Sequence, residues 1–127
     1  MNELAELLIE KGITISSVES FTVGNFATML GSIPGISKVY KGSLITYQSE
    51  TKERLLSIDL CVSFTGNAGP NAMEGKPVGE VYIGIAYQDV VVYKLNLTGS
   101  RQEIASKAVE FAKKKIIEKI NENLKKN

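Results

Sequence analysis

The residues best suited to chemistry lie in the stretch SSVESFTVGNFATML, residues 16–30. This stretch is typical of a short apolar strand that turns sharply into a helix, with Ser20 at the turn. A serine at such a turn points outward beside free backbone N–H groups, which can stabilise an oxyanion. Ser20 could therefore be a nucleophile. Serine and threonine also cap helices, however, and the hydrolase motif GxSxG is absent, so the pattern alone favours a cap at Ser20 or Thr22.

Any nucleophile in this chain needs an unusual base, because the sequence contains no histidine. Ser-His-Asp and Cys-His catalysis and the usual histidine-containing zinc sites are thereby excluded. Lys52 follows a predicted strand after one short turn, and a partly desolvated lysine can act as a base. Tyr47 ends that strand and could relay a proton. Both would lie near Ser20 if the two strands are parallel, although each taken singly is better interpreted as a surface residue.

The segment TGNAGPNAMEGKPVG, residues 65–79, contains four glycines and two prolines and is expected to be irregular. Its backbone N–H groups could cradle an anion, although GxxxxGK[ST] and GxGxxG are both absent. Lys76 and Arg101 could pair with a phosphate, or could simply be solvated. Structureless connections of this length in compact domains are often functional, but a long irregular turn is the alternative.

The composition suits one compact domain over residues 1–127, since 43% of the residues are hydrophobic and 23% are charged. The net charge of +1 gives no bulk attraction to nucleic acid, and we interpret the C-terminal lysines as a solvated helix end. No apolar run has the length of a membrane span, and the N-terminus lacks the features of a signal peptide. We therefore expect a cytoplasmic protein without nucleic-acid or membrane partners. Cys61 is expected to be a small buried hydrophobe.

Hydrophobic spacing predicts a layered α/β fold with a mixed sheet of about five strands flanked by helices. The predicted strands are residues 13–18, 39–48, 59–64, 80–87 and 90–97. The predicted helices cover about residues 2–11, 23–31 and 50–57, and a long segment from Ser100 through Leu124.

Individual residues are expected to begin, end or bend these elements. Gly12 should end the first helix, and Ser49 and Ser100 should cap the third and last helices. Gly42 indicates a bulge or a close backbone approach within its strand. Gln88 and Asp89 predict a tight hairpin between the last two strands.

These segments, in this order, resemble the CinA C-terminal domain family, which includes stand-alone nicotinamide mononucleotide deamidases. The matching stretches are VESFTVGNFATMLGSIPGISKVYKGSLITYQSETKERLL, TGNAGPN with GKPVGEVYIGIA, and GSRQEI. The family shows E-S-C-T-G-G, T-Y-S-N-x-x-K, and T-G-I-A-G-P followed by K-P-V-G. The resemblance covers almost the whole chain, and its motifs are specific in combination.

The resemblance implies an amidohydrolase of pyridine nucleotide salvage, which deamidates nicotinamide mononucleotide to nicotinate mononucleotide and ammonia without a metal or cofactor. It implies Ser20 as the catalytic nucleophile, Lys52 as its base and Tyr47 as a helper. Backbone N–H groups at the start of the following helix would hold the oxyanion. The substrate-binding positions that it implies are Thr22, Gly24, Gly42, Thr65, Gly66, Ala68, Gly69 and Lys76.

The chain also departs from the family pattern. Phe21 and Val23 replace a cysteine and a glycine of E-S-C-T-G-G. Between RLLSID and LCVSFTG the family carries a further loop and helix that this chain lacks, so we expect an uncovered sheet face and self-association into a homo-oligomer. Two alternatives stay open: a reduced, non-catalytic module of the same fold that binds a nucleotide or a partner, and an unrelated hydrolase with the same Ser-Lys pair.

Overall fold

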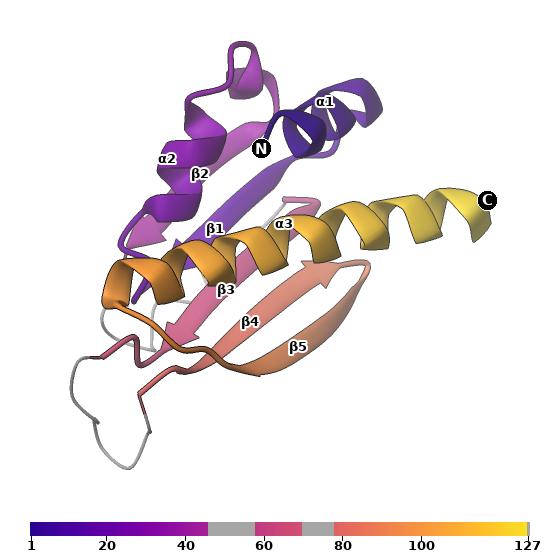
Figure 1. Cartoon of the computed structure of the whole chain (residues 1–127). Helices are drawn as coiled ribbons and strands as arrows, with labels where there is room; N and C mark the ends of the chain where they lie inside the picture. The colour runs from indigo at the N-terminus through magenta and orange to yellow at the C-terminus, as the bar shows by residue number, and fades with distance from the viewer. Residues whose placement is uncertain (46–57, 70–77, 127) are drawn as a thin grey trace.

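The computed structural model describes residues 1–45, 58–69 and 78–126 (Figure 1). The helices are α1 (Asn2–Lys11), α2 (Asn25–Gly31), the short 3-10 helix η1 (Ile36–Lys38) and α3 (Arg101–Lys126). The strands are β1 (Ile15–Glu19), β2 (Tyr40–Ile45), β3 (Leu60–Gly66), β4 (Glu80–Tyr87) and β5 (Asp89–Asn96). The predicted helix at 50–57, its cap Ser49 and the last part of the strand predicted at 39–48 lie outside the described residues.

The strands form one mixed sheet in the order β2-β1-β3-β4-β5, which confirms the predicted fold class. Strand β1 is parallel to both of its neighbours, β2 and β3, whereas β3, β4 and β5 pair antiparallel. A parallel pair needs a crossover connection, and α2 lies in the crossover from β1 to β2. Helices α1, α2 and α3 all lie on one side of the sheet (Figure 1).

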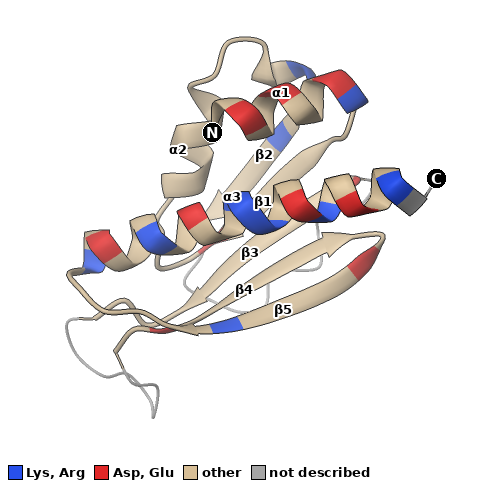
Figure 2. Ribbon diagram, turned by 45° about the vertical axis from the view of Figure 1, so that its right-hand side comes forward, with Lys and Arg blue, Asp and Glu red and all other residues tan. Residues whose placement is uncertain are grey.

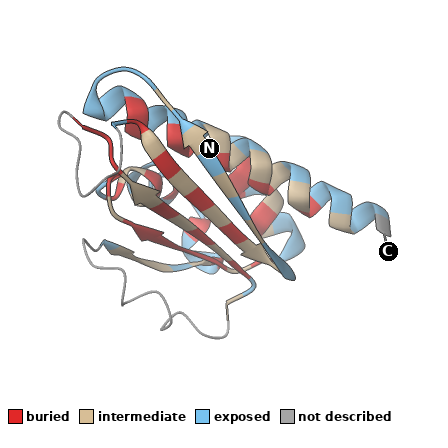
Figure 3. Cartoon of the chain, turned by 90° about the horizontal axis from the view of Figure 1, so that it is seen from below, coloured by how far each residue is buried: buried red, intermediate tan, exposed pale blue. Residues whose placement is uncertain are grey.

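The core lies between these helices and the sheet. Alternate residues of β3 and β4 point toward the helices and are fully buried, as the banding along the strands in Figure 3 illustrates. The helix-facing residues of these two strands are Leu60, Val62, Phe64, Val81, Ile83 and Ile85. The predicted four-residue stripe of α3 is buried from Ile104 through Ile120, but Leu124 is 43% exposed because the helix extends beyond the core at its end.

On the side of the sheet away from the helices, β5 carries exposed apolar residues, whereas β1 is buried on both faces. Tyr93 of β5 packs edge-on against Phe111 of α3, so the odd-numbered residues of β5 face the helices. Val90 and Val92 therefore point away from them, and they are 72% and 64% exposed. The expected self-association through this face stays a prediction.

Backbone conformation explains why two boundaries differ from the prediction. Helix α2 begins at Asn25, because Val23 and Gly24 have φ of +48° and +84° and cannot belong to a right-handed helix. The hairpin reverses at Gln88 alone, where φ is +69°, and Asp89 already pairs with Tyr87.

Four further predictions concern strands and turns. Strand β1 is offset from its predicted range and ends at Glu19, and β3 runs to Gly66, two residues into the segment predicted to be irregular. Gly12 ends α1 with φ of +65°, as predicted. A register shift between β1 and β2 confirms the bulge predicted at Gly42, where φ is +124°.

The outer surface of α3 carries lysines and glutamates intermixed along the helix, as expected for a solvated helix (Figure 2). Lys113 pairs with Glu110, and Lys115 pairs with Glu118, both one helical turn apart. Among the described residues, no helix combines the length and the apolar character that a bilayer span requires. At Cys61, burial raises the pKa of the thiol, against a smaller opposing effect of the Ser16 hydroxyl, so the thiolate is disfavoured.

Helix α3 starts with a capping box that confirms the cap predicted at Ser100. The N–H of Glu103 donates to Ser100 Oγ at 3.1 Å, and the N–H of Ser100 donates to Glu103 Oε1 at 2.9 Å. The bond from the Ser100 N–H to the carboxylate, with a smaller contribution from the Ser100 hydroxyl, holds the pKa of Glu103 below its usual value. The stabilisation from the carboxylate is therefore present above the ordinary pKa of glutamate and is lost as the pH falls through the lowered value.

We expect Ser100→Ala to lower the free energy of unfolding by about 1 kcal/mol, because the first turn of α3 loses the acceptor for one N–H group. Urea unfolding followed by circular dichroism measures this change. Ser106→Ala is the matched control on the exposed side of the same helix, and it should raise stability slightly because alanine has the higher helix propensity. Equal effects of the two substitutions would contradict the capping role.

Candidate functional site

Ser20 lies at the carboxyl end of β1, where the chain turns into α2. Its N–H and its hydroxyl both donate to the carbonyl oxygen of Phe64 on β3, each at 3.1 Å. Its own carbonyl accepts the N–H of Val23 at 3.1 Å, which closes a β-turn. The Ser20 side chain is half-buried, and its hydroxyl must rotate away from the Phe64 carbonyl before its proton can pass to a base.

The interpretation of Ser20 or Thr22 as a helix cap is wrong. The cap position of α2 is occupied by Gly24, which makes no side-chain bond. The buried carboxylate of Glu19 instead accepts the N–H groups of Phe26 and Ala27, both at 3.0 Å. Thr22 donates its hydroxyl to the same carboxylate at 2.8 Å. Glu19 thus binds the first N–H groups of α2, which the sequence indicates only through the position of Glu19 directly before Ser20.

The expected oxyanion donors at the start of α2 are already occupied. Besides the two N–H groups bound by Glu19, the N–H of Asn25 donates to the carbonyl of Thr22 at 2.9 Å. Within the described part of the chain, the N–H groups of Phe21, Thr22 and Gly24 have no hydrogen-bond acceptor. Donors for an oxyanion at Ser20 would therefore come from the turn itself, starting with the residue that follows the nucleophile.

The parallel pairing brings several predicted site residues to one edge of the sheet. Glu19 pairs with Ile45 of β2 and with Phe64 of β3, so all three strands end beside the Ser20 turn. Thr65 and Gly66 end β3 at this edge, and Ala68 and Gly69 follow after Asn67. The chain also leaves β2 at this edge. Strands β1 and β2 are parallel, which is the condition under which Tyr47 and Lys52 are expected to lie near Ser20. Those two residues and Lys76 lie outside the described residues.

Hydrogen bonds hold the segment from Asn67 to Gly69 in a defined conformation. Asn67 is buried, and its side-chain oxygen accepts the N–H of Gly69 at 2.9 Å, which forms an Asx-turn. Arg101, the first residue of α3, donates a guanidinium N–H to the carbonyl of Gly69 at 2.8 Å. Arg101 therefore anchors this segment rather than being simply solvated, and a role in binding phosphate stays a prediction.

Two of the predicted binding glycines differ in position. A Cβ added to Gly24 would lie 3.0 Å from the Ile45 side chain, so Gly24 packs closely against the end of β2. Gly42 lies in the bulge before the centre of β2, where an added Cβ would meet nothing within 4 Å. The structure thus brings Gly24 to the Ser20 edge but does not bring Gly42 there.

Val23 is strained at the nucleophile turn, where it replaces a glycine of the family motif. A β-branched residue with φ of +48° crowds its own backbone, and the side chain is 51% exposed. We expect Val23→Gly to raise the free energy of unfolding by about 1 kcal/mol, because the strain disappears and little burial is lost. Thermal and urea unfolding measure the change.

The control for this prediction is Val90→Gly. Val90 is also an exposed valine, but it lies in β5 with an ordinary strand backbone. Glycine there should lower stability by about 1 kcal/mol through its backbone entropy. Destabilisation of the same size at both positions would contradict the strain at Val23.

Comparison with known proteins identifies the family. The sequence model of the CinA C-terminal domain matches residues 1–60 and 56–120, which together cover nearly the whole chain. The chain belongs to the CinA C-terminal domain family. It is 33% identical to the competence-damage inducible protein of Bacillus mycoides (strain KBAB4), over 91% of this chain and 36% of that protein. The CinA domain described here thus spans about a third of the length of the curated relatives it matches.

Solved structures of CinA proteins share the fold. The competence damage-inducible protein A (ComA) of Klebsiella pneumoniae subsp. pneumoniae MGH 78578 superposes with a TM-score of 0.87 at 22% identity, covering 94% of each chain. The competence/damage inducible protein CihA of Agrobacterium tumefaciens gives a TM-score of 0.77 at 25% identity, covering 91% of this chain and 92% of that one. These likenesses support the architecture described above.

The family matches also indicate where this CinA domain is shortened. The two matched ranges meet at residues 56–60, between β2 and β3. The alignment with the Bacillus mycoides protein extends over 147 positions, although the chain has 127 residues. The relative therefore has residues without a counterpart here, which agrees with the segment expected to be absent after RLLSID.

Proposed function

We propose that this CinA domain is an amidohydrolase that deamidates nicotinamide mononucleotide, with Ser20 as the nucleophile and Lys52 as the base. The observation that carries the proposal is the position of Ser20 at a tight strand-to-helix turn, next to backbone N–H groups of Phe21 and Thr22 without acceptors among the described residues. Family membership adds support, because the positions of all three implied catalytic residues are retained in the sequence.

The proposed reaction has two stages. Neutral Lys52 takes the Ser20 hydroxyl proton, with help from Tyr47, and Ser20 Oγ bonds to the carboxamide carbon of the substrate. Backbone N–H groups of the turn stabilise the oxyanion that forms. The C–N bond then breaks, ammonia leaves with the proton from Lys52, and water hydrolyses the acyl-enzyme to nicotinate mononucleotide and free Ser20.

The test is an assay of both products. Purified protein is incubated with nicotinamide mononucleotide, ammonia is measured by a coupled enzyme assay, and nicotinate mononucleotide is identified by chromatography. Equal molar amounts of the two products are expected. Folded protein that forms neither product would reject the deamidase proposal.

The second candidate is a reduced, non-catalytic module that binds a nucleotide or a protein partner. Strained Val23 in place of a glycine and the shortened stretch between β2 and β3 are the observations that favour it. Thermal shift separates the two functions, because a ligand that binds the native state raises the melting temperature. Stabilisation by nicotinamide mononucleotide without product formation would favour the binding module.

A further inference from the structure

Glu19 is a buried acid, and the proposed reaction gives it no role. Its side chain has no exposed surface, and burying a carboxylate is costly unless hydrogen bonds compensate. No lysine or arginine of the described segments forms an ion pair with it. Its hydrogen bonds must therefore compensate for the lost water.

Four donors surround the carboxylate, and each oxygen accepts two of them. The Thr22 hydroxyl at 2.8 Å and the Phe26 N–H at 3.0 Å donate to Oε1. The Ser17 hydroxyl at 3.1 Å and the Ala27 N–H at 3.0 Å donate to Oε2. Both oxygens thus act as acceptors of two hydrogen bonds each. One side chain joins strand β1, the nucleophile turn and helix α2.

A row of hydroxyl groups extends these bonds to β2. Ser17 contacts Ser43, and Ser43 contacts Tyr40. Because the single hydroxyl proton of Ser17 is used on Glu19, Ser43 must donate to Ser17 and Tyr40 must donate to Ser43. Glu19 is therefore tied to β2, the strand after which the chain leads to Tyr47 and Lys52.

The backbone of the turn needs such support. Val23 and Gly24 have positive φ, and a strained conformation persists only where the surrounding structure fixes it. The Glu19 carboxylate accepts bonds from Thr22, directly before these residues, and from Phe26 and Ala27, which follow them after Asn25. These bonds also occupy the N–H groups of the first turn of α2, so they determine which N–H groups face the reaction.

We infer that Glu19 is a positioning residue: its carboxylate fixes the turn that presents Ser20 and selects the N–H groups of Phe21 and Thr22 as oxyanion donors. It acts through the turn and does not touch the substrate. The catalytic part of this inference rests on the proposed function, whereas the structural part does not.

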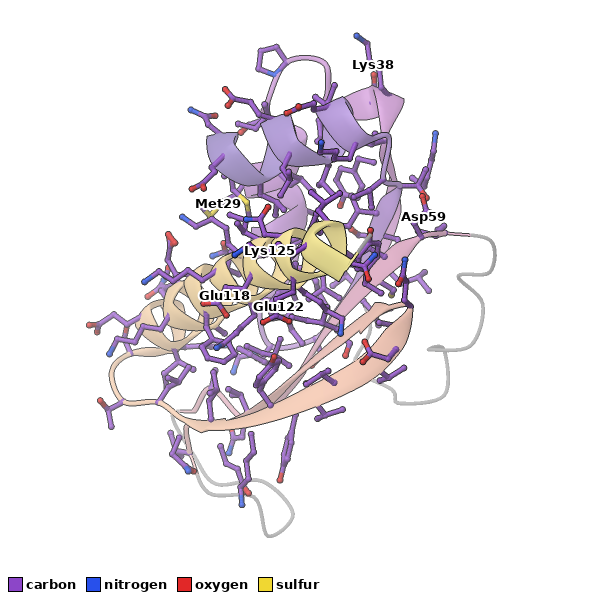
Figure 4. The ribbon with its side chains drawn as sticks, turned by 90° about the vertical axis from the view of Figure 1, so that its right-hand side faces the viewer. Met29, Lys38, Asp59, Glu118, Glu122 and Lys125 are labelled. Atoms are coloured by element: carbon purple, nitrogen blue, oxygen red, sulfur yellow. The ribbon has the colours of Figure 1, made fainter. Side chains whose placement is uncertain are left out.

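Glu19→Gln is the test variant, because glutamine keeps the size but replaces one acceptor oxygen with an NH₂ group that faces donors. Asp59→Asn is its matched control. Asp59, labelled in Figure 4, also accepts a backbone N–H, from Thr14 at 3.0 Å. Asp59 directly precedes β3, whereas Ser20 follows the parallel strand β1, so the two residues lie at opposite ends of the sheet. Ser17→Ala, which removes one donor of the four, is the milder variant should Glu19→Gln not fold.

The first measurement is amide hydrogen exchange by NMR, which needs no turnover. In Glu19→Gln we expect exchange at Phe26 and Ala27 to accelerate at least about tenfold, while Val62 and Ile83 in the central strands change less than about twofold. Ser17→Ala should accelerate the same amides less, and Asp59→Asn should leave them unchanged. Unchanged exchange at Phe26 and Ala27, or equal acceleration across the central strands, would overturn the inference.

The second measurement is kinetic. We expect Glu19→Gln to lower kcat for nicotinamide mononucleotide at least about tenfold with KM within about twofold, because positioning affects the transition state. If Glu19 holds the strained turn, Val23→Gly removes the strain and must reduce the loss of kcat caused by Glu19→Gln. The effects of the two substitutions on kcat should therefore be non-additive. Additive effects would overturn the positioning role. A wild type without turnover would reject the proposed function, and hydrogen exchange would still decide the role of Glu19.

Discussion

Ser20→Ala is expected to reduce ammonia release from nicotinamide mononucleotide by at least about 10³-fold, because no acyl-enzyme can form without the nucleophile. The fold should tolerate the change, since Ser20 is half-buried and, within the described residues, its side chain makes one bond, to the Phe64 carbonyl. Its main-chain bond to the same carbonyl is retained. Initial rates of ammonia release, with protein concentration matched, measure the effect.

Ser32→Ala is the matched control for this prediction. Ser32 lies at the other end of α2, where its exposed hydroxyl donates to the carbonyl of Met29 at 2.8 Å. That variant should retain wild-type turnover. Thermal shift with the substrate adds a second readout, because Ser20→Ala should still be stabilised by nicotinamide mononucleotide although it cannot convert it. Equal rates of ammonia release in Ser20→Ala and wild type would exclude Ser20 as the nucleophile.

Gly79→Ala is expected to lower the free energy of unfolding by about 4 kcal/mol or more, which places it among the most destabilising kinds of substitution. Gly79 has φ of +86°, and an added Cβ would lie 1.9 Å from the backbone oxygen of Leu97. A backbone oxygen cannot move away to relieve this clash as the end of a flexible side chain can. The N–H of Gly79 also donates to Asn67 at 2.7 Å, and its carbonyl accepts the N–H of Leu97 at 2.8 Å.

The melting temperature of Gly79→Ala should therefore fall by more than about 10 °C. Gly12→Ala is the matched control: Gly12 also has positive φ, of +65°, but an added Cβ would meet nothing within 4 Å. Gly12→Ala should lower the free energy of unfolding by about 1 kcal/mol, from backbone strain alone. Similar melting temperatures for the two variants would show that the contact with Leu97 can relax. The last glycine of the K-P-V-G motif would then lose its structural explanation.

The Gly79 bonds also connect stability to the site. Gly79 holds Asn67, Asn67 shapes the turn to Gly69, and Arg101 anchors the Gly69 carbonyl to the start of α3. The segment beside Ser20 is thus fixed at two points by residues more than ten positions away in the sequence. A change at Gly79 is expected to disturb that edge of the sheet even where the protein still folds.

The sequence by itself determined the type and order of the described α-helices and strands, because these depend on local patterns, whereas the 3-10 helix η1 was not predicted. Each signal determines structure only within a few residues of its own position in the sequence. These signals are the apolar spacing in α3, the alternation in β3 and β4, Gly12 after α1 and Ser100 before α3. The bulge at Gly42 followed from the same kind of signal. The absence of histidine likewise restricts the chemistry of this chain in any fold that it could adopt.

Tertiary structure alone decided how polar groups are shared at the nucleophile turn. Ser20, Thr22 and Glu19 could each have bonded the first N–H groups of α2, and local propensity favoured the hydroxyls. The buried carboxylate bonds them, because β1 ends beside α2 and no water reaches Glu19 there. Ser20 is left to bond Phe64, 44 residues away in the sequence, through a strand pairing that no local pattern encodes. That pairing is what frees Ser20 from capping and leaves its hydroxyl at the edge of the sheet.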